Sequence, residues 1–197
     1  MIFYHIDRSN KLQENQIIQL NKYFFKSDPE ICSFFASLFP NGISRHGEQY
    51  LNDFFTFPPN MSPIFYLKTD LECMGTHVSE NLLELYRQSS FPEIPSRFTS
   101  MFALKNIDDL KYWPELTKND FKIFEIDYSG PVYQLDASFL KSAICYLDQN
   151  NKNARIGFYP ALILKEFHQY LSGRISNNPK PEILLPLPIT IGKEIYL

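Results

Sequence analysis

The amino-acid sequence predicts an α+β fold. Strand-like and helix-like segments are mixed along the chain without the regular strand–helix alternation of a doubly wound sheet. The seven glycines never form a phosphate-cradling loop, so neither a P-loop nor a Rossmann domain is indicated. A chain of 197 residues, 44% of them hydrophobic, suits one domain with a sizeable core. We therefore expect residues 1–197 to form a single domain.

The N-terminal half predicts its elements from local patterns. β-Branched and aromatic residues mark strands, and apolar residues at helical spacing mark helices. Turn chemistry at residues 40–42 and the prolines within 91–95 separate these segments. In chain order we expect a strand at 2–7, a helix at 12–25, a short apolar run at 31–39, an exposed loop at 42–53, a helix at 79–87, an extended segment at 91–95 and a strand at 97–104.

The C-terminal half predicts capped helices between strands. Asn106 and Asp136 stand where helix N-caps are expected, and Pro160 and Gly173 suit the start and end of a helix. The turn at 129–131 predicts a hairpin or a kinked strand. In chain order we expect a helix after Asn106, strands at 121–128 and 132–135, a helix from Asp136 to Leu147, a helix at 161–171, and strands at 182–187 and 190–196.

Composition and charge narrow the classes of function. The net charge is −3 and no basic cluster stands out, so a large nucleic-acid footprint is not expected, although a pocket for one nucleotide is compatible. The 18 Phe and 12 Tyr predict a core or a cleft built from aromatic rings. Cys32, Cys73 and Cys145 have neither metal nor disulfide spacing, so we expect buried, reduced thiols.

Targeting signals are also informative. No apolar run reaches membrane-spanning length, and the N-terminus opens directly into a strand-like segment. We therefore expect no membrane association, and either a cytoplasmic location or secretion into a host cell without a classical signal peptide.

Three stretches gather the polar residues that suit chemistry. Glu182 stands in an apolar strand that holds no cation of its own, and a buried carboxylate is costly unless it is paired or used. His5 lies in the first strand, and Ser100 alternates with Phe98 and Phe102, which predicts one shared face. Taken alone, each residue also has a structural interpretation; Glu182, for example, would guard an edge strand against aggregation.

Together the three stretches resemble the ADP-ribosyltransferase superfamily, most closely an uncharacterised bacterial branch with a His-Ser-Glu type of active site. The run Tyr4-His5-Ile6-Asp7-Arg8-Ser9 is similar to the Tyr-Arg-x-Asp-Ser-Arg opening of cholera and pertussis toxins, with histidine as in diphtheria-toxin-like members. Ser100 looks like the key serine of the Ser-Thr-Ser strand, and Glu182 follows a helix as in many bacterial members. The resemblance implies a split, mostly antiparallel sheet with surrounding helices and a cleft that takes NAD as substrate.

The resemblance also implies roles for individual residues. Glu182 would stabilise the oxocarbenium-like ribose, His5 would bind a ribose or the nicotinamide amide, and Ser100 would orient the sugar or Glu182. Guanidinium groups would bind the pyrophosphate, and aromatic rings would stack on nicotinamide or pack beneath it. The implied catalytic residues are Glu182, His5 and Ser100, and the implied NAD-binding residues are Tyr4, His5, Arg8, Ser96, Arg97, Phe98, Ser100 and Phe102.

The expected reaction is transfer of ADP-ribose from NAD to a macromolecular acceptor with release of nicotinamide. A protein acceptor is favoured and a nucleic acid stays open; a composition rich in Phe, Ile, Lys and Asn fits an AT-rich bacterial genome and a toxin or effector. Lys180 stands where arginine-modifying toxins carry a glutamate, so arginine is not the favoured acceptor. Three alternatives stay open: NAD glycohydrolysis, a non-catalytic nucleotide- or ADP-ribose-binding module, and a structural or interaction protein. No metal ligand set is expected.

Overall fold

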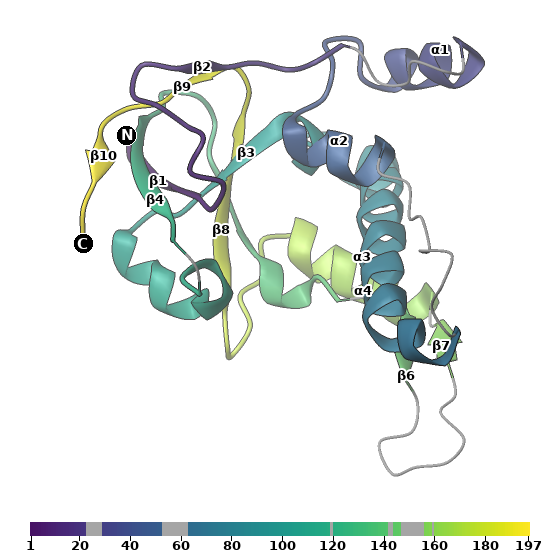
Figure 1. Cartoon of the computed structure of the whole chain (residues 1–197). Coiled ribbons are helices and arrows are strands. Elements are labelled where there is room, and N and C mark those ends of the chain that lie inside the picture. Colours follow the sequence, from purple (N-terminus) through teal and green to yellow (C-terminus); the bar gives the residue numbers. More distant parts are fainter. Residues whose placement is uncertain (23–28, 53–62, 119, 142–143, 147–155, 159) are drawn as a thin grey trace.

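The computed structural model describes residues 1–22, 29–52, 63–118, 120–141, 144–146, 156–158 and 160–197. It confirms the predicted α+β class, since antiparallel sheets are combined with several helices (Figure 1). In chain order the elements are β1 (Ile2–Asp7), β2 (Ile17–Ile18), α1 (Pro29–Leu38), α2 (Arg45–Asn52), α3 (Pro63–Ser90), η1 (Arg97–Thr99), β3 (Ser100–Ala103), η2 (Ile107–Tyr112), η3 (Pro114–Leu116), β4 (Lys122–Asp127), β5 (Tyr133–Asp136), η4 (Ala137–Phe139), β6 (Ile144–Tyr146), β7 (Ile156–Phe158), α4 (Pro160–Leu171), β8 (Pro181–Pro186), β9 (Ile189–Thr190) and β10 (Glu194–Ile195), where η marks a 3-10 helix.

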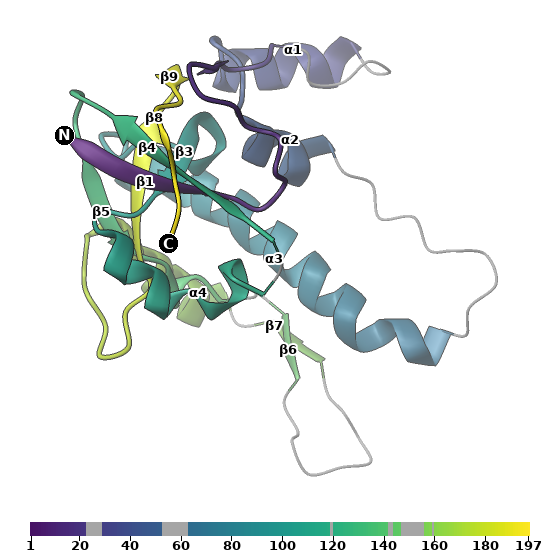
Figure 2. The ribbon, with the colours of Figure 1, turned by 60° about the vertical axis from the view of Figure 1, so that its left-hand side comes forward.

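Two three-stranded antiparallel sheets form the centre of the fold. One has the strand order β1-β4-β10 and the other the order β3-β8-β5. Tyr4 and Leu104 exchange backbone hydrogen bonds of 2.9 and 2.8 Å, so β1 of the first sheet touches the end of β3 of the second. Figure 2 shows β1 and β4 side by side, with the long helix α3 crossing the molecule beyond them.

The position of strand β8 explains why its sequence is apolar throughout instead of alternating between apolar and polar residues. Residues 182–185 are all buried, because both faces of the strand are covered. Ile183 and Leu185 pack in one cluster with Phe3 and Phe124 of the first sheet. On the other face, Leu184 packs against helix α4 in a second cluster. Glu182 shares this second face with Leu184, because side chains in a strand alternate.

Several predicted elements are confirmed. The first strand has the predicted bounds, Ile2–Asp7. Helix α4 begins at Pro160, and Gly173 follows it with a φ of +70°. Asp136 caps a helical turn, since its carboxylate accepts a hydrogen bond of 2.9 Å from the Ser138 amide.

The predicted helix at 12–25 is wrong over residues 12–22, which hold only the short strand β2. The carboxylate of Asp7 accepts hydrogen bonds of 2.8 Å from the amides of both Lys11 and Leu12, and Asn10 and Asn15 have positive φ angles of 53° and 63°. These features hold the segment in turns that a helix does not tolerate. Residues 23–25 lie outside the described part of the chain.

The exposed loop expected at 42–53 is helical over Arg45–Asn52, and Asp53 lies outside the described residues. Gly42 turns the chain with a φ of +100°, and the hydroxyl of Ser44 accepts a hydrogen bond of 3.2 Å from the Gly47 amide, which caps α2. The apolar run at 31–39 is also helical, as α1. The helix expected at 79–87 is part of the longer α3.

Three further expectations are corrected. The strand expected at 97–104 opens with the 3-10 turn η1. The hairpin expected over 121–135 is wrong, because β4 and β5 belong to different sheets. The helix after Asp136 ends at Phe139 and gives way to β6; Leu147 lies outside the described residues. The side chains of Cys32, Cys73 and Cys145 likewise lie outside the described part, so the structure does not test the expectation of buried thiols.

Within the described ranges, no helix combines the length and the apolar character that crossing a membrane requires.

Candidate functional site

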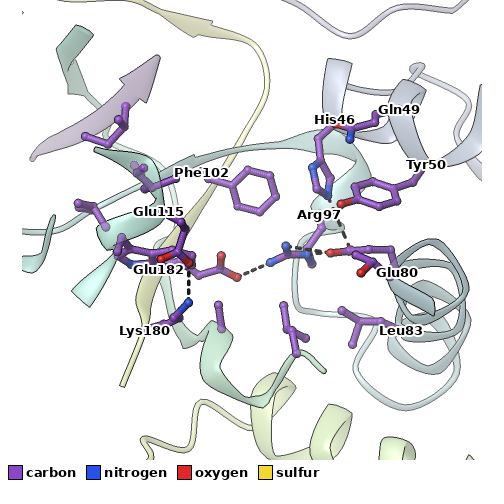
Figure 3. Close-up of a pocket in the computed structure, with 18 of the residues that line it drawn as sticks. His46, Gln49, Tyr50, Glu80, Leu83, Arg97, Phe102, Glu115, Lys180 and Glu182 are labelled. Atoms are coloured by element: carbon purple, nitrogen blue, oxygen red, sulfur yellow. Dashed lines mark hydrogen bonds and ion pairs between the residues drawn. The ribbon is translucent and has the colours of Figure 1, made fainter. Parts of the chain in front are cut away.

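A pocket of about 480 Å³ lies where the two central sheets meet and helices α2 and α3 approach them (Figure 3). Its walls come from β1, α2, α3, η1, β3, η3, η4, α4 and β8, so both ends of the chain contribute to it. The polar and aromatic residues of its lining that matter below are Tyr4, His5, Arg8, His46, Gln49, Tyr50, Glu80, Arg97, Phe102, Trp113, Glu115, Lys180 and Glu182.

The guanidinium of Arg97 lies between two carboxylates in the wall of this pocket. Its Nε and Nη2 donate hydrogen bonds of 3.0 and 3.1 Å to Glu80, and its Nη1 donates to Glu182 (Figure 3). The three side chains are only 5 to 12% exposed. One cation faces two anions, so the wall of the pocket holds an excess of one buried negative charge.

Neighbouring groups fix Arg97 in this position. The hydroxyl of Ser96 accepts a hydrogen bond from the Phe98 amide and begins the 3-10 turn η1 that carries Arg97. The Phe102 ring centroid lies 4.6 Å from the guanidinium carbon, within the range of a cation–π contact. The hydroxyl of Tyr170 accepts a hydrogen bond of 2.9 Å from Arg97 and donates to Glu182.

Electrostatics keep these groups in defined protonation states. Burial alone would raise the pKa of the Glu80 carboxyl, but the Arg97 guanidinium and the His46 ring outweigh it and lower this pKa to about 2. Burial alone would lower the pKa of Arg97, but Glu182 and Glu80 raise it well above its ordinary value. Burial raises the pKa of the Tyr170 hydroxyl well above its ordinary value, so this hydroxyl keeps the proton that it donates to Glu182.

His5 is held as a neutral ring. Its Nδ1 lies 2.7 Å from the carbonyl oxygen of Phe102, and a carbonyl only accepts, so Nδ1 is the donor. Burial lowers the pKa of His5, which keeps the second nitrogen, Nε2, unprotonated at neutral pH. The ring that strand β1 contributes to the pocket lining is therefore neutral, with Nε2 as its unprotonated nitrogen.

Glu182 is paired, although its own strand holds no cation. Arg97 reaches it from η1 and Tyr170 from α4. The interpretation of Glu182 as the guard of an edge strand is wrong, because β8 lies between β3 and β5 in the middle of its sheet.

The pocket brings together six of the nine residues singled out in the sequence and leaves three outside. Tyr4, His5, Arg8, Arg97, Phe102 and Glu182 line it, and Ser96, Phe98 and Ser100 do not.

The three excluded residues have structural contacts instead. The buried hydroxyl of Ser100 donates a hydrogen bond of 2.7 Å to the Ser96 carbonyl, and the Ser96 hydroxyl donates one of 2.7 Å to Glu84. Phe98 packs in a cluster with Phe39 and Ile43. The expected alternation of residues 98, 100 and 102 on one face fails because η1 occupies residues 97–99.

The polar pocket residues that the sequence did not single out include His46 and Glu80. The sequence predicts an exposed loop around His46, whereas α2 turns its ring toward Glu80 (Figure 3). Glu80 and Glu84 are buried on the same face of α3 as Leu83. Acidic residues at core positions of a helix were the available signal, because such positions normally carry apolar side chains.

At the opposite side of Glu182, Lys180 pairs with Glu115 at 2.5 Å and lies 5.3 Å from the centroid of the Trp113 ring. The indole of Trp113 donates a hydrogen bond of 2.8 Å to the Pro181 carbonyl and so anchors η3 to β8. Within the described ranges, no group of three or more His, Cys, Asp or Glu residues is arranged to hold a metal ion.

Comparison with known families places the whole pocket within one matched region. Residues 3–196 match a family model described as a protein of unknown function, DUF2441. No curated protein matches the chain. The matched region includes both His5 near one end and Glu182 near the other. The chain therefore belongs to the DUF2441 family.

Proposed function

We propose that this protein cleaves the nicotinamide–ribose bond of NAD and transfers ADP-ribose to a macromolecular acceptor. The observation that carries the proposal is the shared pocket of His5 and Glu182, which come from the first strand and from the last long strand of the chain. This pocket lies where two antiparallel sheets meet at the Tyr4–Leu104 bridge. Such an arrangement is what the resemblance to ADP-ribosyltransferases implies, and it supports a fold of that type.

The charge of the pocket supports the same chemistry. Breaking the bond to nicotinamide develops positive charge on the ribose, and the nicotinamide ring of NAD is itself cationic before it leaves. A fixed, buried negative charge stabilises such a transition state because it needs no reorganisation during the reaction. Glu182 supplies that charge, held in place by Arg97 and Tyr170.

Arg8 is the better candidate for the pyrophosphate of NAD. The Nε, Nη1 and Nη2 atoms of Arg97 already donate to Glu80, Glu182 and Tyr170. Arg8 lines the pocket with an exposed side chain, and no carboxylate within the described ranges forms an ion pair with it. A planar guanidinium matches phosphate oxygens in pairs, which suits this role.

The test is nicotinamide release from NAD by the purified protein, compared between Glu182→Gln and Glu84→Gln. Both variants replace a buried glutamate that pairs with an arginine, but only Glu182 lines the main pocket. We expect Glu182→Gln to lose roughly 10²–10³-fold in rate, by analogy with removal of other preorganised groups. Glu84→Gln should retain the rate of the parent protein once both are measured well below their melting temperatures.

The fate of the ADP-ribose separates transferase from glycohydrolase. With labelled NAD, transfer predicts label on a component of a cell lysate, and hydrolysis predicts free ADP-ribose with or without lysate. NAD binding without nicotinamide release in either condition would favour a binding module and contradict the proposal. Equal rates for the parent and Glu182→Gln would remove Glu182 from the chemistry.

A further inference from the structure

We infer that His46, oriented by Glu80, is the base that takes the proton from the acceptor in this reaction. The inference rests on the proposed function and adds to it a pair of residues from helices α2 and α3, outside the three stretches that suggested the function.

The reaction needs such a base. The bond between ribose C1′ and the nicotinamide nitrogen breaks, and its electron pair leaves with nicotinamide. As that bond breaks, a hydroxyl or water oxygen forms a new bond to C1′ and must lose its proton in the same step. A positioned side chain that accepts this proton in the transition state contributes roughly 10²–10⁴-fold to the rate.

His46 has the geometry of a supported base. Its Nε2 lies 3.7 Å from Oε2 of Glu80, within ion-pair range but beyond hydrogen-bond distance. Its ring is held between Tyr50 and Phe102, with both ring centroids 4.6 Å away (Figure 3). Nε2 is buried and has no hydrogen-bond partner among the residues that the structure describes. A proton taken up by this ring creates a cation beside an existing carboxylate, which stabilises it.

The three glutamates among the pocket-lining residues already pair with cations. Glu182 and Glu80 both accept from Arg97, and Glu115 accepts from Lys180. His5 donates from Nδ1 to the Phe102 carbonyl, and the resemblance to ADP-ribosyltransferases implies that its ring binds a ribose or the nicotinamide amide of NAD. His46 is the remaining neutral imidazole of the lining.

The charges around His46 agree with this role. It faces Glu80 from α3, Arg97 from η1 and Glu182 from β8. Burial lowers the pKa of His46, although Glu80 partly opposes the shift. The ring is therefore neutral at pH 7 and free to accept a proton. Glu80 acts as a positioning residue, because it holds Arg97 and faces the imidazole at once.

The experiment measures nicotinamide release and NAD affinity for His46→Ala, with His168→Ala as the control. His168 is exposed on α4 and bonds to Tyr86, outside the main pocket. We expect His46→Ala to lose roughly 10²-fold or more in rate with water as acceptor, while its Kd for NAD stays within about twofold. His168→Ala should behave as the parent protein.

Sodium azide distinguishes a base from a packing residue. Azide attacks carbon without a proton to lose, so it should restore nicotinamide release in His46→Ala and yield an ADP-ribosyl azide detectable by mass spectrometry. Azide should not rescue Glu182→Gln. For Glu80→Gln, loss of the neighbouring anion should move the acidic limb of the rate–pH profile to lower pH.

Three results would overturn the inference. If the parent protein is active and His46→Ala is equally active, His46 is not the base, and the proposed function still stands. A loss of rate that azide does not rescue assigns His46 to packing. A parent protein that releases no nicotinamide, with or without lysate, removes the proposed function and this inference with it.

Discussion

Arg97 contacts both carboxylate oxygens of Glu80, through Nε at 3.0 Å and through Nη2 at 3.1 Å. A two-point contact of this kind fixes the plane of a guanidinium as well as its position. The remaining nitrogen, Nη1, is thereby directed at Glu182. A residue on helix α3 thus determines how the acid on strand β8 is held, although the two carboxylates do not touch through any described hydrogen bond.

Arg97→Ala should destabilise the protein strongly. The structure places Arg97 between two buried carboxylates. Removing one partner of a buried ion pair typically costs 3–5 kcal/mol, because the other partner stays buried and unpaired. Urea unfolding at pH 7 would measure the loss. A free energy of unfolding within about 1 kcal/mol of the parent value would show that the ion pairs of Arg97 with Glu80 and Glu182 contribute little to stability.

Arg8→Ala should weaken NAD binding without changing stability. Arg8 is exposed, so little packing is lost. Loss of a charge-assisted hydrogen bond costs roughly 1.5–3 kcal/mol, which corresponds to a rise in Kd of roughly 10- to 100-fold. Isothermal titration calorimetry with NAD would test this, with Arg174→Ala, an exposed arginine outside the main pocket, as the matched control. An unchanged Kd for Arg8→Ala would exclude Arg8 from the pyrophosphate site.

Glu80 should make stability depend on pH in the acid range. Its pKa is about 2 in the folded protein, below the ordinary value of 4.5, so the folded state binds this proton more weakly. The resulting stabilisation is fully present above pH 4.5 and is lost as the pH falls from there through 2. Its size is on the order of 3 kcal/mol. Urea unfolding from pH 7 to pH 3 should show the gap between the parent and Glu80→Gln narrowing below pH 4.5; a constant gap would contradict the assignment.

Gly47→Ala should lower both stability and activity. A Cβ at this position of α2 would lie 2.8 Å from the backbone oxygen of Phe98, so the helix carrying His46 must shift. Such overpacking typically costs 1–3 kcal/mol. Gly173→Ala is the control: its φ of +70° strains an alanine by about 1 kcal/mol, but the added Cβ meets nothing closer than 3.7 Å. Nicotinamide release should fall for Gly47→Ala but not for Gly173→Ala. Equal activity in the two variants would contradict the prediction, because it would mean that a shift of α2 away from Phe98 does not affect the rate.

The parts of the fold that the sequence predicts are those with local causes. Strand β1 and helix α4 follow from their own periodicity and from Pro160 and Gly173. The helix expected at 12–25 is wrong although the cause is also close in sequence, because the Asp7 carboxylate accepts hydrogen bonds from the amides of Lys11 and Leu12. Helix propensity does not include this competition between a side-chain carboxylate and helical hydrogen bonds for the same backbone amides.

The residues of the site likewise divide into those that the local sequence reveals and those that it does not. Glu182 is conspicuous because a lone acid in an apolar strand breaks the pattern of its surroundings. Its partners, Arg97 and Tyr170, come from elements far away in the chain, so no window of sequence contains the pair. Ser100 fits the expected motif in sequence, but next to the 3-10 turn its hydroxyl donates a hydrogen bond to the Ser96 carbonyl. Pattern alone does not reveal such a change of local geometry.

The order of the pocket residues along the chain has a consequence for synthesis. A growing polypeptide carries His5, Glu80 and Arg97 before Glu182, which arrives on strand β8 after helix α4. Strand β8 is also the middle strand of its sheet, so β3 and β5 have no shared partner until it is made. On the proposed function, a nascent or truncated chain lacks its acid and its central strand together. A copy of the chain that ends before β8 is therefore expected to release no nicotinamide from NAD.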